Sequence, residues 1–248
     1  MLSKLGYVYR TFRFRLWAMG ARLKLRRMGG KFTLEAAGTP RCQTMPRLES
    51  NDAGASLTLR LGRDCRIGRD MVIELRAGKH GTVEFGDRVT VQNNVRLQPW
   101  GGLIRLADDC QLRDGGEIQS LGELTMGWKT LIGRHVHVHC DERITFGPRA
   151  GVAEHSTVID SDHDADGSDT WFMDRPINTA PVEIGENTMI SANSFVTKGT
   201  KIGRNCQTGA GAIIVGGEYP DGSLIVGAPA RVLRPLRAAV TEPTPPPE

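Results

Sequence analysis

Between residues 184 and 214, a compact and mostly aliphatic residue recurs at every sixth position. The series is Ile184, Ile190, Val196, Ile202, Thr208 and Ile214. A small residue stands four positions after each of the first five members, as Thr188, Ser194, Thr200, Cys206 and Ala212. A period of six matches neither the 3.6 of a helix nor the 2 of an ordinary strand. It predicts a chain that turns a corner every six residues and closes a triangular coil after about eighteen, as in a hexapeptide-repeat parallel β-helix.

The same period runs through the earlier sequence with wider gaps between coils. Coils are expected to start at Leu61, Phe85, Leu106, Met126 and Phe146, and because these starts lie more than eighteen residues apart, each turn should carry an outward insertion. Between residues 158 and 184 the register jumps by 26 residues instead of 6. We therefore predict a β-helix over 57–235, with one long excursion at about 159–183.

The first 31 residues are basic and contain no acidic residue. Apolar residues recur there at spacings of three and four, namely Leu5, Val8, Phe12, Leu16, Met19 and Leu23. This pattern predicts a basic amphipathic helix over 1–31, ended by two glycines at 29 and 30. Its apolar face could lie on an anionic membrane surface, or it could pack on the β-helix or on a sister subunit. Residues 32–56 contain prolines and are expected to be an irregular connector, and 236–248 a disordered, proline-rich tail.

Composition narrows the picture further. A formal net charge of +4 is too small to indicate nucleic acid as a partner. No apolar run reaches the ~18 residues of a membrane span, and no signal-peptide pattern is visible. We therefore expect a cytoplasmic protein, peripheral at the inner face of the membrane if the helix binds lipid. Cys65, Cys110 and Cys206 occupy the small interior position and are expected to be core residues in a reducing compartment, whereas Cys42 and Cys140 have no assigned role.

Three segments resemble a known family. Val182-Glu-Ile-Gly-Glu-Asn187, Gly209-Ala-Gly211 and Gly227-Ala-Pro-Ala-Arg-Val232 are similar to the C-terminal coils of hexapeptide-repeat acyltransferases, above all the maltose, galactoside and cell-surface polysaccharide O-acetyltransferases. The resemblance implies an all-β fold, a left-handed parallel β-helix, and a homotrimer with active sites between neighbouring prisms. It also implies acetyl-CoA or another acyl-CoA as co-substrate, and a hydroxyl of a sugar, glycolipid or other glycoconjugate as acceptor.

The long excursion carries the candidate catalytic residues. His163 is the only histidine on it and is flanked by Asp160 and Asp162. A histidine titrates near neutral pH and can take a proton from a hydroxyl, while a carboxylate can fix its tautomer. In the family that the chain resembles, a histidine in this context is the general base. We therefore predict His163 as the base, oriented by one of the two aspartates; the alternatives are a solvated acidic loop with an incidental histidine, or a cation-binding aspartate cluster.

The donor site is predicted on the last coils, because acyl-CoA lies along a groove beside them in the resembled family and is contacted largely by backbone. The candidate residues are Ala192, Lys198, Arg204, Gly209, Ala210, Gly211 and Arg231. Arg231 matches the basic residue near the nucleotide phosphates, where a guanidinium suits phosphate geometry. The glycines are equally consistent with corner geometry alone. Met189 and Ser191 stand where many relatives have Trp and Gly, which is a departure in the donor contact.

A second group of histidines comprises His135, His137, His139 and His155. The spacing of twenty residues between His135 and His155 should stack them on adjacent coils, facing outward. Three or four histidines can bind zinc, but the spacing of the carbonic-anhydrase branch of this fold is absent, so no metal is expected. His139, His155 and Trp171 are candidate contacts for the acceptor. The leading function is an acyl-CoA-dependent O-acyltransferase, most simply an O-acetyltransferase; the alternatives are a zinc-dependent γ-carbonic-anhydrase-like hydro-lyase and a non-catalytic, membrane-associated scaffold.

Overall fold

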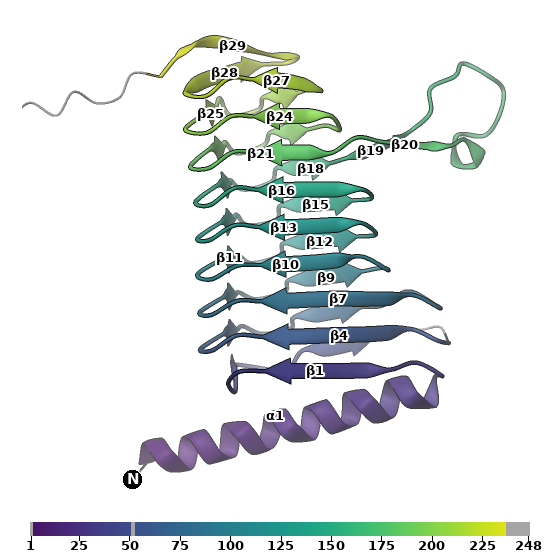
Figure 1. Cartoon of the computed structure of the whole chain (residues 1–248), viewed down its shortest axis with the longest axis vertical. Coiled ribbons are helices and arrows are strands. Elements are labelled where there is room, and N and C mark those ends of the chain that lie inside the picture. The colour runs from purple at the N-terminus through teal and green to yellow at the C-terminus, as the bar shows by residue number, and fades with distance from the viewer. Residues whose placement is uncertain (1, 51–52, 237–248) are drawn as a thin grey trace, which may run out of the picture.

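The computed structural model describes residues 2–50 and 53–236, with side chains from residue 6 onward. One helix, α1 (Leu2–Arg27), lies across the end of a three-sided prism of stacked coils, and one long excursion leaves the prism near its other end (Figure 1). In the described part of the chain, the three sheets hold nine, ten and eight strands. This is the all-β architecture that the six-residue period predicted, and it has about nine turns, which is consistent with a left-handed parallel β-helix.

Each of the first eight coils contributes one strand to each face of the prism, and the last coil ends on the second sheet. The first sheet contains β1 (Phe32–Ala36), β4 (Ser56–Leu61), β7 (His80–Phe85), β10 (Leu103–Leu106), β13 (Glu123–Met126), β16 (Arg143–Phe146), β21 (Val182–Ile184), β24 (Thr200–Ile202) and β27 (Gly217–Tyr219). The second contains β2 (Arg41–Cys42), β5 (Arg66–Ile67), β8 (Thr90–Val91), β11 (Gln111–Leu112), β14 (Leu131–Ile132), β17 (Gly151–Val152), β22 (Met189–Ile190), β25 (Gln207–Thr208), β28 (Ser223–Gly227) and β29 (Ala230–Pro235). The third contains β3 (Arg47–Glu49), β6 (Val72–Glu74), β9 (Arg96–Pro99), β12 (Glu117–Ser120), β15 (His137–Cys140), β18 (Thr157–Ile159), β23 (Phe195–Val196) and β26 (Ile213–Ile214).

The chain turns at three corners, which we name by the sheets they join. The first corner joins the first sheet to the second, the second corner joins the second to the third, and the third corner leads from the third sheet back to the first. At the second corner, one residue per coil has a positive φ from β5 onward, and the series is Asp70, Asn94, Gly115, His135, His155, Asn193 and Gly211.

The six-residue period fills the interior as predicted. Phe146 pairs with Ile184, and Ile184 pairs with Ile202 in the next coil, and all three side chains are buried. The small residues of the period, including Thr188 and Ala212, are buried as well. Large aliphatic and small side chains therefore alternate along the inside of the prism, which lets a narrow core pack without voids.

Several of the small interior residues also donate hydrogen bonds to corner carbonyls of an adjacent coil. Thr188 Oγ1 donates to the Gly203 carbonyl oxygen at 2.7 Å, and Cys110 Sγ to that of Gly127 at 3.1 Å. Each of these bonds gives a corner carbonyl of the next coil a side-chain donor from the interior. The interior cysteines are thus both space-filling and weak donors, and all five cysteines of the chain are free thiols.

The β-helix begins one coil earlier than predicted. The segment 32–56, expected to be an irregular connector, contains β1, β2 and β3, and its register places Ala36, Cys42 and Leu48 beside the first coil that the sequence indicated. These three residues keep the six-residue period, and Pro40 and Pro46 occupy its small interior position and are buried. The period was masked because proline resembles a breaker and because alanine and cysteine replace the usual aliphatic residues.

Helix α1 closes the N-terminal end of the core. Phe14, Ala18, Ala21 and Leu25 are buried against the first coil, and Trp17 Nε1 donates to the Pro46 carbonyl oxygen at 2.7 Å. A capping element of this kind covers the apolar end that a stack of coils leaves open. The apolar face that the spacing predicted to be buried or membrane-bound, from Val8 to Leu23, is not the face that packs on the prism, and its side chains are exposed. No helix in the described residues is long and apolar enough to cross a membrane.

Candidate functional site

The long excursion leaves the prism at the third corner as a two-stranded ribbon. Strand β19 (Ser161–His163) pairs antiparallel with β20 (Ile177–Thr179), so that Asp162 lies opposite Asn178 and His163 opposite Ile177. A short 3₁₀ helix, η1 (Phe172–Asp174), lies near its tip. Beyond the ribbon the loop stands clear of the prism wall (Figure 1). The excursion thus spans about 160–181, close to the predicted 159–183.

Asp160 anchors the base of the excursion. Its carboxylate is fully buried and accepts three backbone N–H groups, from Asp141 at 2.7 Å, Glu142 at 2.9 Å and Arg143 at 2.7 Å. These amides form the third corner of the preceding coil. The residue therefore holds the exit point of the excursion to the prism, and its carboxylate is engaged there instead of with the imidazole of His163.

Asp162 makes a different contact from the one expected. It pairs with Lys198 Nζ at 2.6 Å, which ties β19 to the third corner of a later coil. Successive side chains of a strand point to opposite sides, so Asp162 and His163 project away from each other. Neither predicted aspartate contacts the imidazole, and Lys198, a candidate donor contact, is engaged by Asp162.

The imidazole of His163 is held by packing. Its side chain is half-buried, and the ring meets that of Phe172 edge to face, with centroids 5.6 Å apart and an interplanar angle of 86°. Nδ1 is buried and has no hydrogen-bond partner among the described residues. A buried ring nitrogen without a partner is uncommon in folded proteins.

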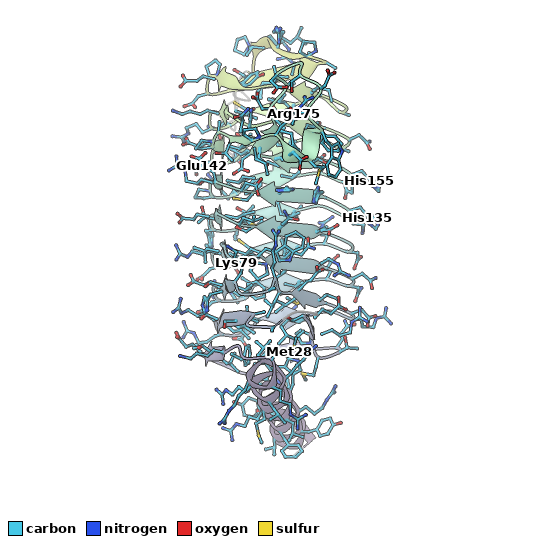
Figure 2. All side chains as sticks on the ribbon, turned by 90° about the vertical axis from the view of Figure 1, so that its right-hand side faces the viewer. Met28, Lys79, His135, Glu142, His155 and Arg175 are labelled. Atoms are coloured by element: carbon cyan, nitrogen blue, oxygen red, sulfur yellow. The ribbon has the colours of Figure 1, made fainter. Side chains whose placement is uncertain are left out.

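Arg175 organises the outer loop, a role that the sequence analysis missed. Its guanidinium donates to the backbone oxygens of Ser168 at 2.7 Å and Thr170 at 2.9 Å, and it lies 3.4 Å from an Asp166 carboxylate oxygen. Arg175 is labelled in Figure 2, on the side to which the excursion projects. The available signal was that Arg175 is the only arginine or lysine among the acidic residues of the excursion.

The excursion is tied down at its base and apolar at its outer end. Thr179 Oγ1 donates to Glu142 Oε2 at 2.6 Å on the return to the prism. Farther out, four large apolar side chains are exposed, namely Trp171, Phe172, Met173 and Ile177. A group of this kind on a projecting loop is typical of a surface that another molecule covers. Trp171, a predicted acceptor contact, belongs to this group.

The second group of histidines lies on and beside the third sheet. His139 is on β15, where its Nε2 lies 3.1 Å from Asp141 Oδ1 and 2.9 Å from Gln119 Nε2. The Asp160 N–H donates to the His139 backbone oxygen at 3.3 Å, so His139 lies near the base of the excursion. On the same strand, partial burial lowers the pKa of His137.

His135 and His155 stack on adjacent coils as their spacing predicted. Their rings are 5.2 Å apart and nearly parallel, at 12°, and both are exposed at the second corner (Figure 2). That corner is the opposite edge of the third sheet from the excursion. The structure therefore separates His155 from His139, although both were candidate acceptor contacts. Among residues 2–50 and 53–236, no three or more His, Cys, Asp or Glu side chains form a group that could hold a metal ion.

The predicted donor residues are divided among the corners. Ala192 and the segment Gly209–Gly211 lie together at the second corner, where the Gly211 N–H donates to the Ala192 oxygen at 2.9 Å. Arg204 is at the first corner, where its N–H donates to Asp221 Oδ1 at 2.8 Å. Arg231 is exposed on β29 at the C-terminal end of the prism. The structure thus gathers the small residues and leaves the basic ones apart.

Comparison with known proteins agrees with the fold. Residues 181–216 match the family model of the bacterial transferase hexapeptide (six repeats). A probable acetyltransferase of Mycobacterium tuberculosis is 36% identical over 113 residues, which are 46% of this chain and 37% of that protein. The Escherichia coli protein WbbJ, described as a lipopolysaccharide biosynthesis O-acetyl transferase, is 28% identical over 173 residues, or 69% of this chain and 80% of the relative. The chain thus spans well under half of the mycobacterial relative.

Two solved structures overlap this chain more loosely than the sequence relatives do. An N-acyltransferase from Bacillus cereus, AntD, has a TM-score of 0.46 at 14% identity, covering 86% of this chain and 87% of its own. The polysialic acid-specific acetyltransferase NeuO has a TM-score of 0.43 at 15% identity, with coverages of 87% and 91%. The fold and the family match define a hexapeptide-repeat protein. The two sequence relatives are both described as acetyltransferases.

The two aspartates that flank the exit of the excursion should differ sharply in their effect on stability. Asp160→Asn cannot satisfy three buried N–H donors, so it should lower the free energy of unfolding by about 3 kcal/mol. Asp162→Asn is the matched control, since it removes an exposed ion pair that typically contributes about 1 kcal/mol or less. Urea unfolding of both variants measures the difference. An Asp160→Asn protein as stable as Asp162→Asn would contradict the anchoring role.

Proposed function

We propose that this protein is an acyl-CoA-dependent O-acyltransferase that moves an acyl group, most simply acetyl, to a hydroxyl of a sugar or glycoconjugate. The observation that carries the proposal is the half-buried imidazole of His163, with a buried and unpartnered Nδ1, on the one long excursion of the prism. The Escherichia coli relative, described as an O-acetyl transferase of lipopolysaccharide biosynthesis, covers most of the chain and supports a glycan hydroxyl as the acceptor.

The proposed reaction is a direct transfer. Neutral His163 takes the proton of the acceptor hydroxyl as its oxygen attacks the thioester carbonyl, which forms the new C–O bond. The tetrahedral intermediate then collapses, the C–S bond breaks, and the thiolate of CoA takes up the proton from the imidazolium. A backbone N–H between Ile184 and Ala192 stabilises the oxyanion. No covalent enzyme intermediate is needed, since both substrates react within one complex.

The donor is proposed to lie along the last coils. At the second corner, Ala192 and the segment Gly209–Gly211 present backbone with little side chain, which suits an extended pantetheine arm. Arg231 is exposed, and the only hydrogen bond of its guanidinium to the described chain is with the neighbouring Ala230 oxygen. Its guanidinium is therefore available to a nucleotide phosphate, which it can bind in bidentate geometry.

The active form is proposed to be a cyclic homotrimer. His163 and the small residues of the second corner lie at opposite edges of the third sheet within one chain, so a site that uses both is most simply formed between neighbouring prisms. The exposed apolar group on the excursion, Trp171, Phe172, Met173 and Ile177, supports this arrangement because it needs a partner surface. A heterologous contact that closes after three rotations gives each excursion the same neighbour.

Removal of the proposed base should lower turnover and leave donor binding intact. His163→Ala should reduce kcat by roughly 10²–10⁴-fold, the usual contribution of a general base, with CoA affinity nearly unchanged. Thiol release from acetyl-CoA in the presence of a panel of sugars and lipid-linked glycans provides the measurement.

The control for this variant is His80→Ala, an exposed histidine on β7 in an early coil, far from the excursion along the prism. Its turnover should match the wild type. If His163→Ala also keeps wild-type turnover, the base lies elsewhere, and His139 beside Asp141 is the next residue to test.

Loss of the proposed phosphate contact should weaken donor binding alone. Arg231→Ala should reduce CoA affinity by about 1.5–3 kcal/mol, the range for hydrogen bonds to a charged group, or roughly 10- to 150-fold. Arg234→Ala is the matched control, because Arg234 is exposed on the same strand. Calorimetric titration with CoA measures both. Equal affinities for the two variants would remove Arg231 from the donor site.

The trimer is tested by the mass of the protein in solution. Sedimentation equilibrium should give three times the chain mass of 27.1 kDa, and Met173→Asp should weaken the assembly by placing a charge in the covered apolar group. A wild-type protein that stays monomeric at micromolar concentration with CoA present would refute the proposed assembly.

A further inference from the structure

Helix α1 has two apolar faces, and only one of them packs on the prism. The second face is a stripe of five residues, Val8, Phe12, Leu16, Met19 and Leu23, which are each between 49% and 66% exposed. Their spacing of three and four residues places them on one side of the helix, over a length of roughly 22 Å at about 1.5 Å per residue. Figure 1 shows the helix lying across the end of the prism, with its outer side uncovered by the described chain.

Basic side chains flank this stripe on both sides. At 100° per residue, one flank holds Arg15, Arg22 and Arg26, and the other holds Arg13, Lys24 and Arg27. The helix carries no acidic residue, and in the part of the chain that the structure describes none of these six forms a salt bridge; Lys24 Nζ donates to the Leu48 backbone oxygen instead. The positive charge of these six side chains is therefore not neutralised by an acidic partner in the described chain.

A groove adjoins one of these flanks. It has a volume of about 520 Å³ and lies between α1 and the first coil, lined by apolar Phe14, Ala18 and Leu34 together with Arg15 and Arg22. Guanidinium groups beside apolar surface fit the phosphate of a lipid headgroup and the chain next to it. The groove thus resembles the stripe, because in both places basic side chains border apolar ones.

We propose that the exposed face of α1 binds an anionic lipid bilayer, with the helix lying in the plane of the headgroups. An apolar stripe between two rows of Lys and Arg is the arrangement of an interfacial helix, in which the long basic side chains reach up to the headgroups while the apolar ones enter the acyl region. A second copy is a poorer occupant, because two such helices face to face would bring many cations together with no acidic residue to offset them.

The bilayer surface is well separated from the excursion. Six steps between neighbouring strands lead from β1 to β21 in the first sheet, and at about 4.8 Å per step they span roughly 29 Å. Loss of membrane binding should therefore leave transfer to a soluble acceptor unchanged. Failure of this inference and failure of the proposed function are then distinguishable, because each has its own assay.

The test is sedimentation of the full chain with vesicles of phosphatidylcholine alone or mixed with phosphatidylglycerol. The wild type should bind the mixed vesicles, release them as salt screens the charges, and bind phosphatidylcholine vesicles weakly. Phe12→Asp/Met19→Asp should reduce binding to the mixed vesicles by about tenfold or more. Leu233→Asp, which places a charge at another exposed apolar residue on β29, is the matched control and should bind as the wild type does.

A second variant, Arg15→Gln/Arg22→Gln, keeps the stripe and removes two flanking charges, and it should reduce binding to the mixed vesicles alone. Three results would overturn the proposal. One is a wild type that ignores the mixed vesicles at low salt, and another is unchanged binding by both double variants. The third is a lipid-free Phe12→Asp/Met19→Asp protein that splits into smaller species in sedimentation velocity, since the stripe would then be covered by a second copy.

Discussion

The structure depends on one constraint, namely that each coil must satisfy the interior polar groups of its neighbours while filling the same narrow column. Backbone N–H groups at each turn donate to the adjacent coil, as His155 N–H does to the Arg134 oxygen at 3.0 Å. Small interior residues complete the scheme: Thr188 supplies a hydroxyl to a carbonyl that no backbone donor reaches. Since a coil that misses this register would bury unpaired polar groups, the six-residue period extends through nearly the whole prism and leaves little freedom for a concave site.

The candidate chemistry therefore lies where the register is interrupted. The third corner tolerates the interruption because the Asp160 carboxylate accepts the three N–H groups of the preceding corner. If the coil continued without the excursion, these N–H groups would need other acceptors. From this anchor the ribbon of β19 and β20 carries His163 away from the wall, and Arg175 shapes the loop beyond it through backbone oxygens. The prism thus fixes the position at which the excursion begins, while the outer loop determines the shape of the candidate site.

Much of the fold could be predicted because the six-residue period of interior residues can be counted directly along the sequence. The coils from Leu61 to Ile214 and the long excursion followed from spacing alone, but the first coil was missed because Pro40 and Pro46 hide its period. The helix was predicted, but its buried face was not, since Ala18 and Ala21 are weakly apolar and pack only because the first coil approaches closely. The candidate site was less predictable. Proximity in sequence suggested that Asp160 or Asp162 orients His163. In the structure Asp160 is buried against the preceding corner, and Asp162 points to the opposite side of its strand from His163.

The central claim is that the prism is the scaffold and the excursion is the catalytic element. The most direct test is mass spectrometry of candidate glycan acceptors incubated with isotopically labelled acetyl-CoA and either the wild type or a variant whose residues 162–178 are replaced by a short turn. The account predicts labelled ester on a hydroxyl acceptor with the wild type, none with the shortened variant, and the same β-sheet circular dichroism spectrum for both, since the prism does not need the excursion in order to fold. Equal labelling by the two proteins would contradict it.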